Sequence, residues 1–379
     1  MEKLCVSALA RSPNKPIPAM QRINAAIGGS STAMTQLPPV RSRTRQYVVL
    51  LLAVVLMAGG WIGFWKYAAN AAQENLENWR AREARAGRVL ACGSQEIGGF
   101  PFRFELKCDG ASAVLGGGQI PVELKAANVH IAAQVYQPGL LISEVTGPLT
   151  IGDPGRPPAY TANWKLAQSS VSGLPEAPRR VSLVVSEPVI TRAEPAGQVA
   201  RADHIEIHGR LSEGSVSDRP VIEIAFEAKQ FETAEGGPLL ATTTDGSIDA
   251  VLRGLHDFSP KPWPARFREI QQAGGRIEIR KMRIKQGDTI AVGAGNLAIN
   301  PEGRVEGQLN MTVAGLDAFV NRMMAASGQR VSMSISLGLG LLAGSKQVEG
   351  KPAIAIPLKV VNGAMMLGPL KLGEVPPLF

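Results

Sequence analysis

An uncharged apolar run near the N-terminus constrains this chain more than any other feature. Residues 47–65 of the 379-residue sequence contain no Asp, Glu, Lys or Arg. At ~1.5 Å of rise per residue, a helix of this length spans the ~30 Å hydrocarbon core of a bilayer. Aromatic residues, which prefer the membrane–water interface, lie at both ends of the run: Tyr47, Trp61, Phe64, Trp65 and Tyr67. We therefore predict a single transmembrane helix over residues 47–67.

The distribution of charge predicts the orientation of this helix. Residues 1–46 contain seven basic residues against Glu2 alone, so they carry +6 of the formal net charge of +8. Three of the basic residues, Arg41, Arg43 and Arg45, directly precede the apolar run, which places this arm in the cytoplasm by the positive-inside rule. We expect residues 1–46 to be disordered and the bulk of the chain to lie on the other side. Because the remainder carries only +2, the charge does not indicate nucleic-acid binding.

Two alternatives concern the N-terminus. A cleavable signal peptide would fit the small-x-small pattern Ala69-Asn70-Ala71. A membrane anchor is favoured, because the apolar region of a signal peptide is usually ~7–15 residues long and this run is longer. Met34 directly precedes the compact arm and helix, so we also consider it an alternative start of translation.

Two of the three cysteines lie beyond the apolar run. Cys92 and Cys108 are sixteen positions apart, and an even pair in an oxidising compartment favours a disulfide. The hairpin-like segment between them can bring the two thiols together. Two unrelated buried thiols are the alternative. Since no C-x-x-C occurs, neither thioredoxin-like chemistry nor a zinc knuckle is indicated.

Strand patterning dominates from residue 88 onward, whereas residues 68–87 are rich in helix formers and predict a helical stalk. Apolar and polar residues alternate with a period of two in several segments: 102–107, 205–208, 221–227, 277–285 and 308–313. One apolar and one polar face is typical of half-buried antiparallel strands. We therefore predict a mainly β (α+β) domain over residues 88–379. Its expected architecture is a long antiparallel twisted sheet, trough-like or barrel-like, with a few packed helices.

Some local elements can be predicted within this domain. Helices are expected at residues 264–273, before Gly274-Gly275, and at residues 316–327. Residues 331–342 alternate like a strand but also fit a buried helix. Asn362-Gly363 between two apolar runs predicts a two-residue hairpin turn.

The segment 92–109, with its core Gly98-Gly99-Phe100-Pro101-Phe102-Arg103-Phe104, resembles an uncharacterised bacterial envelope family catalogued as domain of unknown function 2125. The apolar helix, the cysteine pair and the closing Gly368-Pro369-Leu370 match the layout of that family. The resemblance implies a single-pass protein of the bacterial inner (cytoplasmic) membrane with its bulk in the periplasm, and it brings no activity. More loosely, residues 275–316 look like the strand-rich modules of AsmA-like proteins, which are implicated in envelope lipid handling.

A search for catalytic chemistry yields one weak pattern. His204, Glu206 and His208 share one face of a predicted strand, which suggests a partial metal site or, more simply, the solvated face of that strand. No nucleophile-elbow, metalloprotease or phosphate-loop motif occurs. We therefore expect no catalytic, cofactor-binding or metal-binding residues and predict that the protein is not an enzyme.

Phe100, Phe102 and Phe104 alternate, so on a strand they would face one way. Core packing is the simpler role, and a binding edge for a partner is the alternative. Arg103 and Glu105 would then point to solvent.

These features predict a non-enzymatic, membrane-anchored envelope protein that contacts membrane lipid through one helix and binds lipid or another apolar ligand, or supports envelope organisation. A periplasmic module that binds an envelope protein partner through a sheet edge is the first alternative. A hydrolase of envelope polymers is the second.

Overall fold

The computed structural model describes residues 43–116, 121–174, 177–235, 242–259, 261–318, 346–367 and 370–379. The predictions for Met34, for the arm up to residue 42, for residues 331–342 and for Gly368-Pro369 lie outside the described residues. So does most of the helix predicted at residues 316–327, of which the described part, residues 316–318, is helical.

The apolar run belongs to one uninterrupted helix, α1 (Thr44–Arg85), none of whose residues is fully buried. Among the described residues, α1 is the helix that is long and apolar enough to cross a membrane. Residues 58–379 form one compact unit, which contains the C-terminal part of α1 and the whole sheet. After Arg85 the chain turns at Gly87, whose φ of 81° favours glycine, and enters the first strand.

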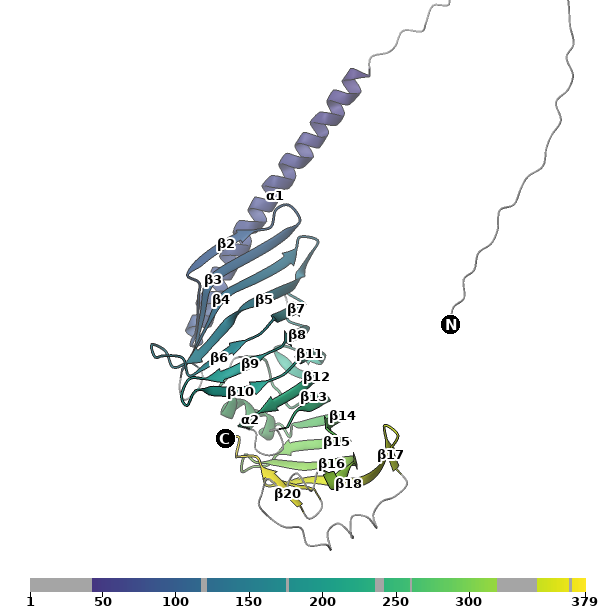
Figure 1. Ribbon diagram of the computed structural model, residues 1–379. Coiled ribbons are helices and arrows are strands. Elements are labelled where there is room, and N and C mark those ends of the chain that lie inside the picture. Colours follow the sequence, from purple (N-terminus) through teal and green to yellow (C-terminus); the bar gives the residue numbers. More distant parts are fainter. Residues whose placement is uncertain are drawn as a thin grey trace, which may run out of the picture. The chain divides into compact units, whose positions relative to one another are not determined.

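Within the described residues, twenty strands follow α1 along the chain. Figure 1 shows their arrangement. The first ten are β1 (Arg88–Ala91), β2 (Ser94–Gly98), β3 (Arg103–Leu115), β4 (Val122–Gln134), β5 (Gln137–Gly152), β6 (Tyr160–Asn163), β7 (Leu166–Ser172), β8 (Arg180–Ser186), β9 (Val189–Arg192) and β10 (Gly197–Arg201). The second ten are β11 (His204–Ser215), β12 (Asp218–Thr233), β13 (Thr244–Arg253), β14 (Arg276–Gln286), β15 (Thr289–Ile299), β16 (Val305–Ala314), β17 (Lys346–Val348), β18 (Lys351–Val361), β19 (Ala364–Leu367) and β20 (Leu370–Glu374).

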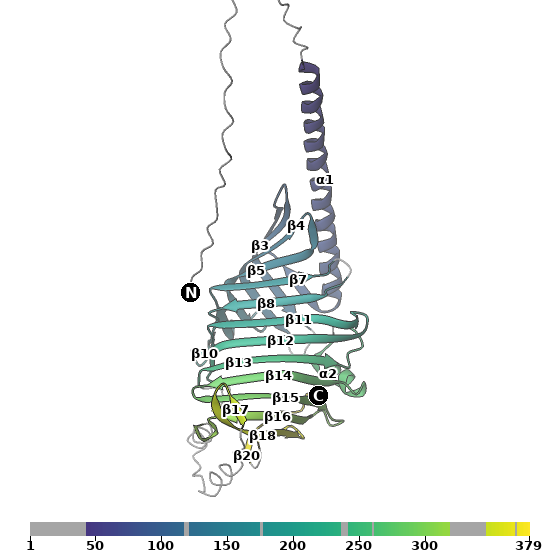
Figure 2. The ribbon, with the colours of Figure 1, turned by 90° about the vertical axis from the view of Figure 1, so that its right-hand side faces the viewer.

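All of these strands belong to one antiparallel sheet, which confirms the predicted mainly β class. Strands β1 and β2 both pair with β3, and the ladder continues through β4 to β5. Beyond β12 it runs through β13, β14, β15 and β16 to β18. Strand β18 also pairs with β17 and with β19, and β19 pairs with β20. Figure 2 shows β7, β8 and β11 to β16 stacked in this succession.

Between β5 and β12 the ladder divides into two branches that together form a partial ring. In one branch β5 pairs with β7, β7 with β8 and β8 with β11, and in the other β5 pairs with β6, β6 with β9 and β9 with β10. Both branches end on β12. The breaks between β6 and β7, between β8 and β9 and between β10 and β11 lie side by side. The amide of Lys165 donates to the Ser186 carbonyl, and the amide of Glu187 donates to the Asp203 carbonyl. In each of these three pairs of consecutive strands, the chain therefore passes from one branch to the other at the same level of the sheet.

Two of the predicted local elements are confirmed. The helix expected at residues 264–273 is α2 (Trp263–Gln272), which begins at a proline-rich segment and is followed by Gly274 and Gly275. Asn362 and Gly363 connect β18 to β19 with φ values of 50° and 82°, as a two-residue hairpin turn of type I′ requires.

A buried hydrophobic cluster lies on one side of the C-terminal half of the sheet. Its members come from β13 to β18 and from the turn after β16: Ala250, Ile279, Met282, Leu309, Met311, Val313, Leu316 and Ile356. Burying a Leu, Ile or Met side chain contributes about 1.5–3 kcal/mol, so this end of the sheet has a substantial core.

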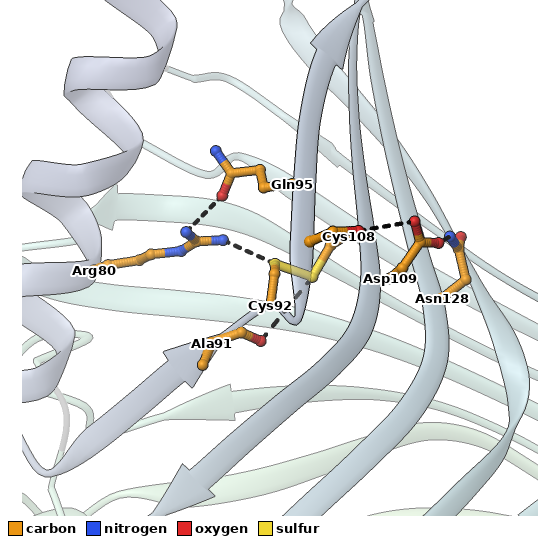
Figure 3. The surroundings of a disulfide bond; sticks show 8 residues. Arg80, Ala91, Cys92, Gln95, Cys108, Asp109 and Asn128 are labelled. Carbon is orange, nitrogen blue, oxygen red and sulfur yellow. Dashed lines mark hydrogen bonds between the residues drawn. A yellow bond between two sulfur atoms is a disulfide. The ribbon is translucent and has the colours of Figure 1, made fainter.

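A disulfide joins Cys92, between β1 and β2, to Cys108 on β3, with a Cα–Cα distance of 5.4 Å (Figure 3). Cys108 is 5% exposed. The guanidinium of Arg80 on α1 donates to the Cys92 sulfur at 3.2 Å and to the Gln95 side chain at 2.6 Å. The disulfide therefore links the β1–β2 connection to β3 at the point where Arg80 of α1 contacts it. We call β2, β3 and the turn between them the first hairpin.

Removal of this disulfide tests its contribution to stability. Replacing Cys92 and Cys108 together by serine should lower the free energy of unfolding by roughly 3 kcal/mol. The disulfide lowers the conformational entropy of the unfolded chain by closing a loop, and the double variant lacks this effect. Urea unfolding of the full chain in detergent measures the change. Peptide mapping without reductant serves as the control, and a fragment that joins Cys5 to either residue would contradict the assignment.

Candidate functional site

One transverse row of side chains crosses twelve strands on a single side of the sheet. Residues that face each other in register lie on the same side, because side chains alternate across a strand with a period of two. The row, read from β3 to β18, is Leu106, Ile131, Ser143, Ser169, Leu183, Ile207, Phe226, Ile248, Met282, Gly293, Met311 and Ile356. We call the side of the sheet that carries this row the apolar face.

The two hydroxyl groups in this row are hydrogen-bonded to each other. The hydroxyls of Ser143 and Ser169 face each other on β5 and β7, and their oxygens are 2.6 Å apart. A hydrogen bond between the two removes most of the cost of placing hydroxyls in an apolar environment. The row is therefore apolar except for this hydrogen-bonded serine pair.

The neighbouring row, one residue along each strand, has the opposite character. It reads Lys107, His130, Glu144, Gln168, Val184, Glu206, Glu227, Ser247, Arg283, Val292, Thr312 and Ala355. We call this side the polar face. The contrast between the two rows holds from β3 to β14. Towards β15 to β18 the polar face also carries a buried hydrophobic cluster, formed by Ile290, Ala314, Val348 and Ala353.

Exposure varies along the apolar face. At the C-terminal end its side chains are buried, as in Met282 and Met311 at 7% and 6% exposure. On β8 and β11 the corresponding side chains are open, since Val181, Leu183 and Ile207 retain 45%, 36% and 39% exposure. A contiguous exposed apolar surface on a folded protein marks an interaction site. The middle of the apolar face is therefore the candidate functional site.

On the polar face, the His204–Glu206–His208 cluster is internally hydrogen-bonded. The Glu206 carboxylate lies 2.8 Å from His204 Nε2 and 3.3 Å from His208 Nε2. The hydrogen bond with His204, followed by that with His208, lowers the pKa of Glu206. Within the described ranges, no group of three His, Cys, Asp or Glu side chains is arranged to hold a metal ion. This arrangement favours the reading of the cluster as the solvated face of a strand.

A surface depression of about 580 Å³ lies beside this cluster. Its charged lining side chains come from the polar face: Arg180, His208, Arg210, Glu223, Asp249 and Arg280. Glu223 accepts hydrogen bonds from Arg210 and from Arg280, and these bonds lower the pKa of its carboxyl group. The paired charges of Glu223, Arg210 and Arg280 thus form one part of the lining, and Ile224, Ala225 and Ala250 form another.

The predicted phenylalanine strand is partly wrong. Strand β3 begins at Arg103, so Phe100 and Phe102 lie in the turn after β2, where Gly99 has a φ of 97° and admits no side chain without contact with Arg103. They are 51% and 66% exposed. Phe104 lies on the apolar face and stacks against Trp65 at 5.8 Å between ring centroids.

Glu105 also differs from its prediction. It is only 8% exposed, whereas the alternation of residues 102–107 placed it in solvent. Its carboxylate pairs with Arg103 and lies 3.6 Å from His130 Nε2, so neighbouring polar side chains on the polar face cover it.

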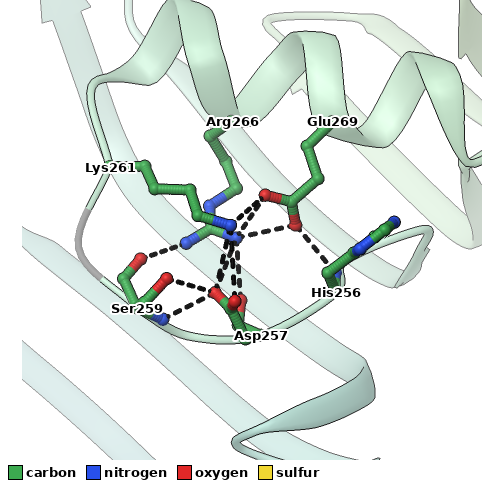
Figure 4. A network of polar contacts seen from close by, with 6 residues as sticks. All are labelled: His256, Asp257, Ser259, Lys261, Arg266 and Glu269. Carbon is green, nitrogen blue, oxygen red and sulfur yellow. Dashed lines mark hydrogen bonds and ion pairs between the residues drawn. The ribbon is translucent and has the colours of Figure 1, made fainter.

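A third cluster lies between α2 and the loop that precedes it (Figure 4). Asp257 accepts hydrogen bonds from the hydroxyl and the amide of Ser259, and these lower the pKa of Asp257 well below its usual range. Glu269 is bound by Lys261 at 2.6 Å and by Arg266 at 2.8 Å. Burial raises the pKa of Glu269, but the bonds from Lys261 and from the His256 amide outweigh it, so the net shift is downward. Both carboxylates are held as anions that fix the loop to α2.

This cluster predicts a pH dependence of stability. The pKa of Glu269 is lower in the folded than in the unfolded chain. Its contribution to the free energy of unfolding is therefore present above pH ~4.3 and is lost as the pH falls through the folded-state pKa. Glu269→Gln should be less stable than the parent near neutrality, by on the order of 1–2 kcal/mol. The difference should shrink on acidification towards pH 3, as measured by urea midpoints. Glu302→Gln, at an exposed turn position, is the matched control, and a pH-independent difference would contradict the assignment.

Comparison with known proteins gives one match. The family described as an uncharacterised protein conserved in bacteria, DUF2125, matches residues 65–376, which include part of α1 and nearly the whole sheet. No curated protein and no solved structure matches the chain.

Proposed function

We propose that this chain, which belongs to the bacterial family DUF2125, is a non-enzymatic envelope protein whose apolar face binds the acyl chains of lipids. In this proposal α1 anchors the chain in the inner membrane, with the arm in the cytoplasm and the sheet in the periplasm. The exposed middle of the apolar face, around Leu183 and Ile207, is the binding surface.

The continuity of the apolar face is the observation that carries the proposal. At ~4.8 Å per strand, the twelve strands span roughly 50 Å, of which the part before the buried cluster, from β3 to β12, covers roughly 30 Å. The strip is elongated, and the two serine hydroxyls in its central row, those of Ser143 and Ser169, are hydrogen-bonded to each other. An extended hydrocarbon chain matches such a surface, because acyl chains require burial of apolar area and offer no hydrogen bonds.

Three glutamates of the described residues take part in ion pairs or hydrogen bonds with basic or imidazole side chains. Glu206, Glu223 and Glu269 are each held by basic or imidazole side chains, and the pKa of each is lowered. A general acid in hydrolysis requires a carboxyl group whose pKa is raised towards the working pH. These carboxylates therefore suit ion pairing on the solvated side of the sheet.

The anchor and the disulfide support the proposed location. α1 is long and apolar enough to cross a membrane, and the disulfide Cys92–Cys108 lies after it in the chain. Structural disulfides form in oxidising compartments such as the periplasm. Both features agree with a periplasmic sheet on a membrane tether.

Photocrosslinking from the two faces of one strand tests the proposal. Benzoylphenylalanine in place of Leu183 should form phospholipid adducts when the full chain is irradiated in intact membranes, because its reactive ketone then lies against acyl chains. The same group in place of Ser182, which faces the opposite side of β8, is the matched control. Equal lipid labelling at both positions would overturn the proposal. Exclusive protein adducts at Leu183 would favour the assembly-module alternative.

A charge placed on the apolar face should block binding. With benzoylphenylalanine at Ile207, the substitution Leu183→Asp should abolish the lipid adduct, because these two residues face each other on β8 and β11. Ser182→Asp should leave the adduct in place, since that side chain points to the polar face. Loss of the adduct in both variants would indicate general damage to the sheet and would contradict a face-specific effect.

A further inference from the structure

The turn between β2 and β3 is fixed to α1 at two successive turns of the helix. The indole nitrogen of Trp61 donates to the Pro101 carbonyl at 3.1 Å, and that of Trp65 donates to the Arg103 carbonyl at 3.2 Å. The Trp65 ring also meets Phe100 edge-on, with ring centroids 5.6 Å apart. The turn therefore lies at a defined height along the helix.

That height coincides with the end of the uncharged segment. Trp61 and Trp65 are the two tryptophans of the uncharged segment 47–65, and Lys66 is the first charged residue after that segment. Tryptophan at the end of a transmembrane segment lies in the interfacial layer between hydrocarbon and water. The residues of the turn are held beside this layer by the two indole hydrogen bonds.

The turn between β4 and β5 is hydrogen-bonded to the turn between β2 and β3. The amide of Val135, at the β4–β5 turn, donates to the Phe102 carbonyl at 2.9 Å. The next residue, Tyr136, is 76% exposed, and Phe102 is 66% exposed. Together with Phe100, these residues give three exposed aromatic rings on two connected turns. We call these two turns the aromatic tips.

We propose that the aromatic tips insert into the interfacial layer of the bilayer that α1 spans, on the side where the sheet lies. The occupant is phospholipid, because the exposed rings continue the aromatic end of α1 and because Phe and Tyr combine apolar bodies with interfacial preference. This inference rests on the proposed membrane anchor but not on lipid binding by the apolar face.

Insertion at this position has a consequence for the apolar face. Phe104 follows Phe102 by two residues, lies on the apolar face and stacks against Trp65. The first strand of the apolar face therefore begins at the bilayer surface. Lipid acyl chains can reach the face from the leaflet without crossing the polar face.

The test uses the full chain reconstituted in vesicles of phosphatidylethanolamine and phosphatidylglycerol. Benzoylphenylalanine is placed at Phe102, at Tyr136 or, as the control, at Trp263, an aromatic residue of α2 that is 72% exposed. Phospholipid adducts at Phe102 and Tyr136 but not at Trp263 are expected. Formation of the Cys92–Cys108 disulfide in each variant confirms that the first hairpin has folded.

The outcomes separate this inference from the proposed function. Absence of adducts at Phe102 and Tyr136, or equal adducts at Trp263, overturns insertion of the aromatic tips. If adducts at Leu183 persist in that case, lipid binding by the apolar face still stands. Conversely, tip adducts that survive Leu183→Asp support insertion independently of the apolar face.

Discussion

The antiparallel register is the constraint on which the rest of this structure depends. Side chains alternate across each strand, so a shift of one residue would move Glu206 to the side where Ile207 lies. The register holds across twelve strands, and it collects one apolar row on one face and one largely polar row on the other. No other feature could build an apolar strip of this length from segments as far apart in sequence as β3 and β18.

The two faces are stabilised by different physics. On the polar face, carboxylates are matched with arginine, lysine or histidine, as Glu223 is with Arg210 and Arg280. On the apolar face, burial of the β13–β18 side chains supplies a core at one end, and the middle remains open. The sheet is thus held at its C-terminal end by packing and at its N-terminal end by the disulfide and α1. The middle of the apolar face, around Leu183 and Ile207, remains exposed.

Aromatic side chains connect the sheet to the helix. Trp65 stacks on Phe104 of the apolar face and also hydrogen-bonds to the backbone of Arg103. A ring that packs on one residue and donates to another defines both distance and direction, which aliphatic side chains cannot do. The position of β3 along α1, and hence the level of the aromatic tips, follows from these contacts.

Periodicity and turn chemistry along the chain were enough to predict the long apolar helix, the antiparallel β class, the hairpin at Asn362-Gly363 and α2, because each of these depends on local sequence. The sequence misplaced Phe100 and Phe102 on a strand, since their alternation imitates one and the turn at Gly99 is not visible in a period-two pattern. It also put Glu105 in solvent, because burial on a polar face depends on neighbours such as Arg103. Strand pairing, by contrast, became visible only in the folded chain, because it joins residues far apart in sequence. The apolar row therefore could not be read in advance: Leu183 and Ile207 are ordinary strand residues until register sets them side by side.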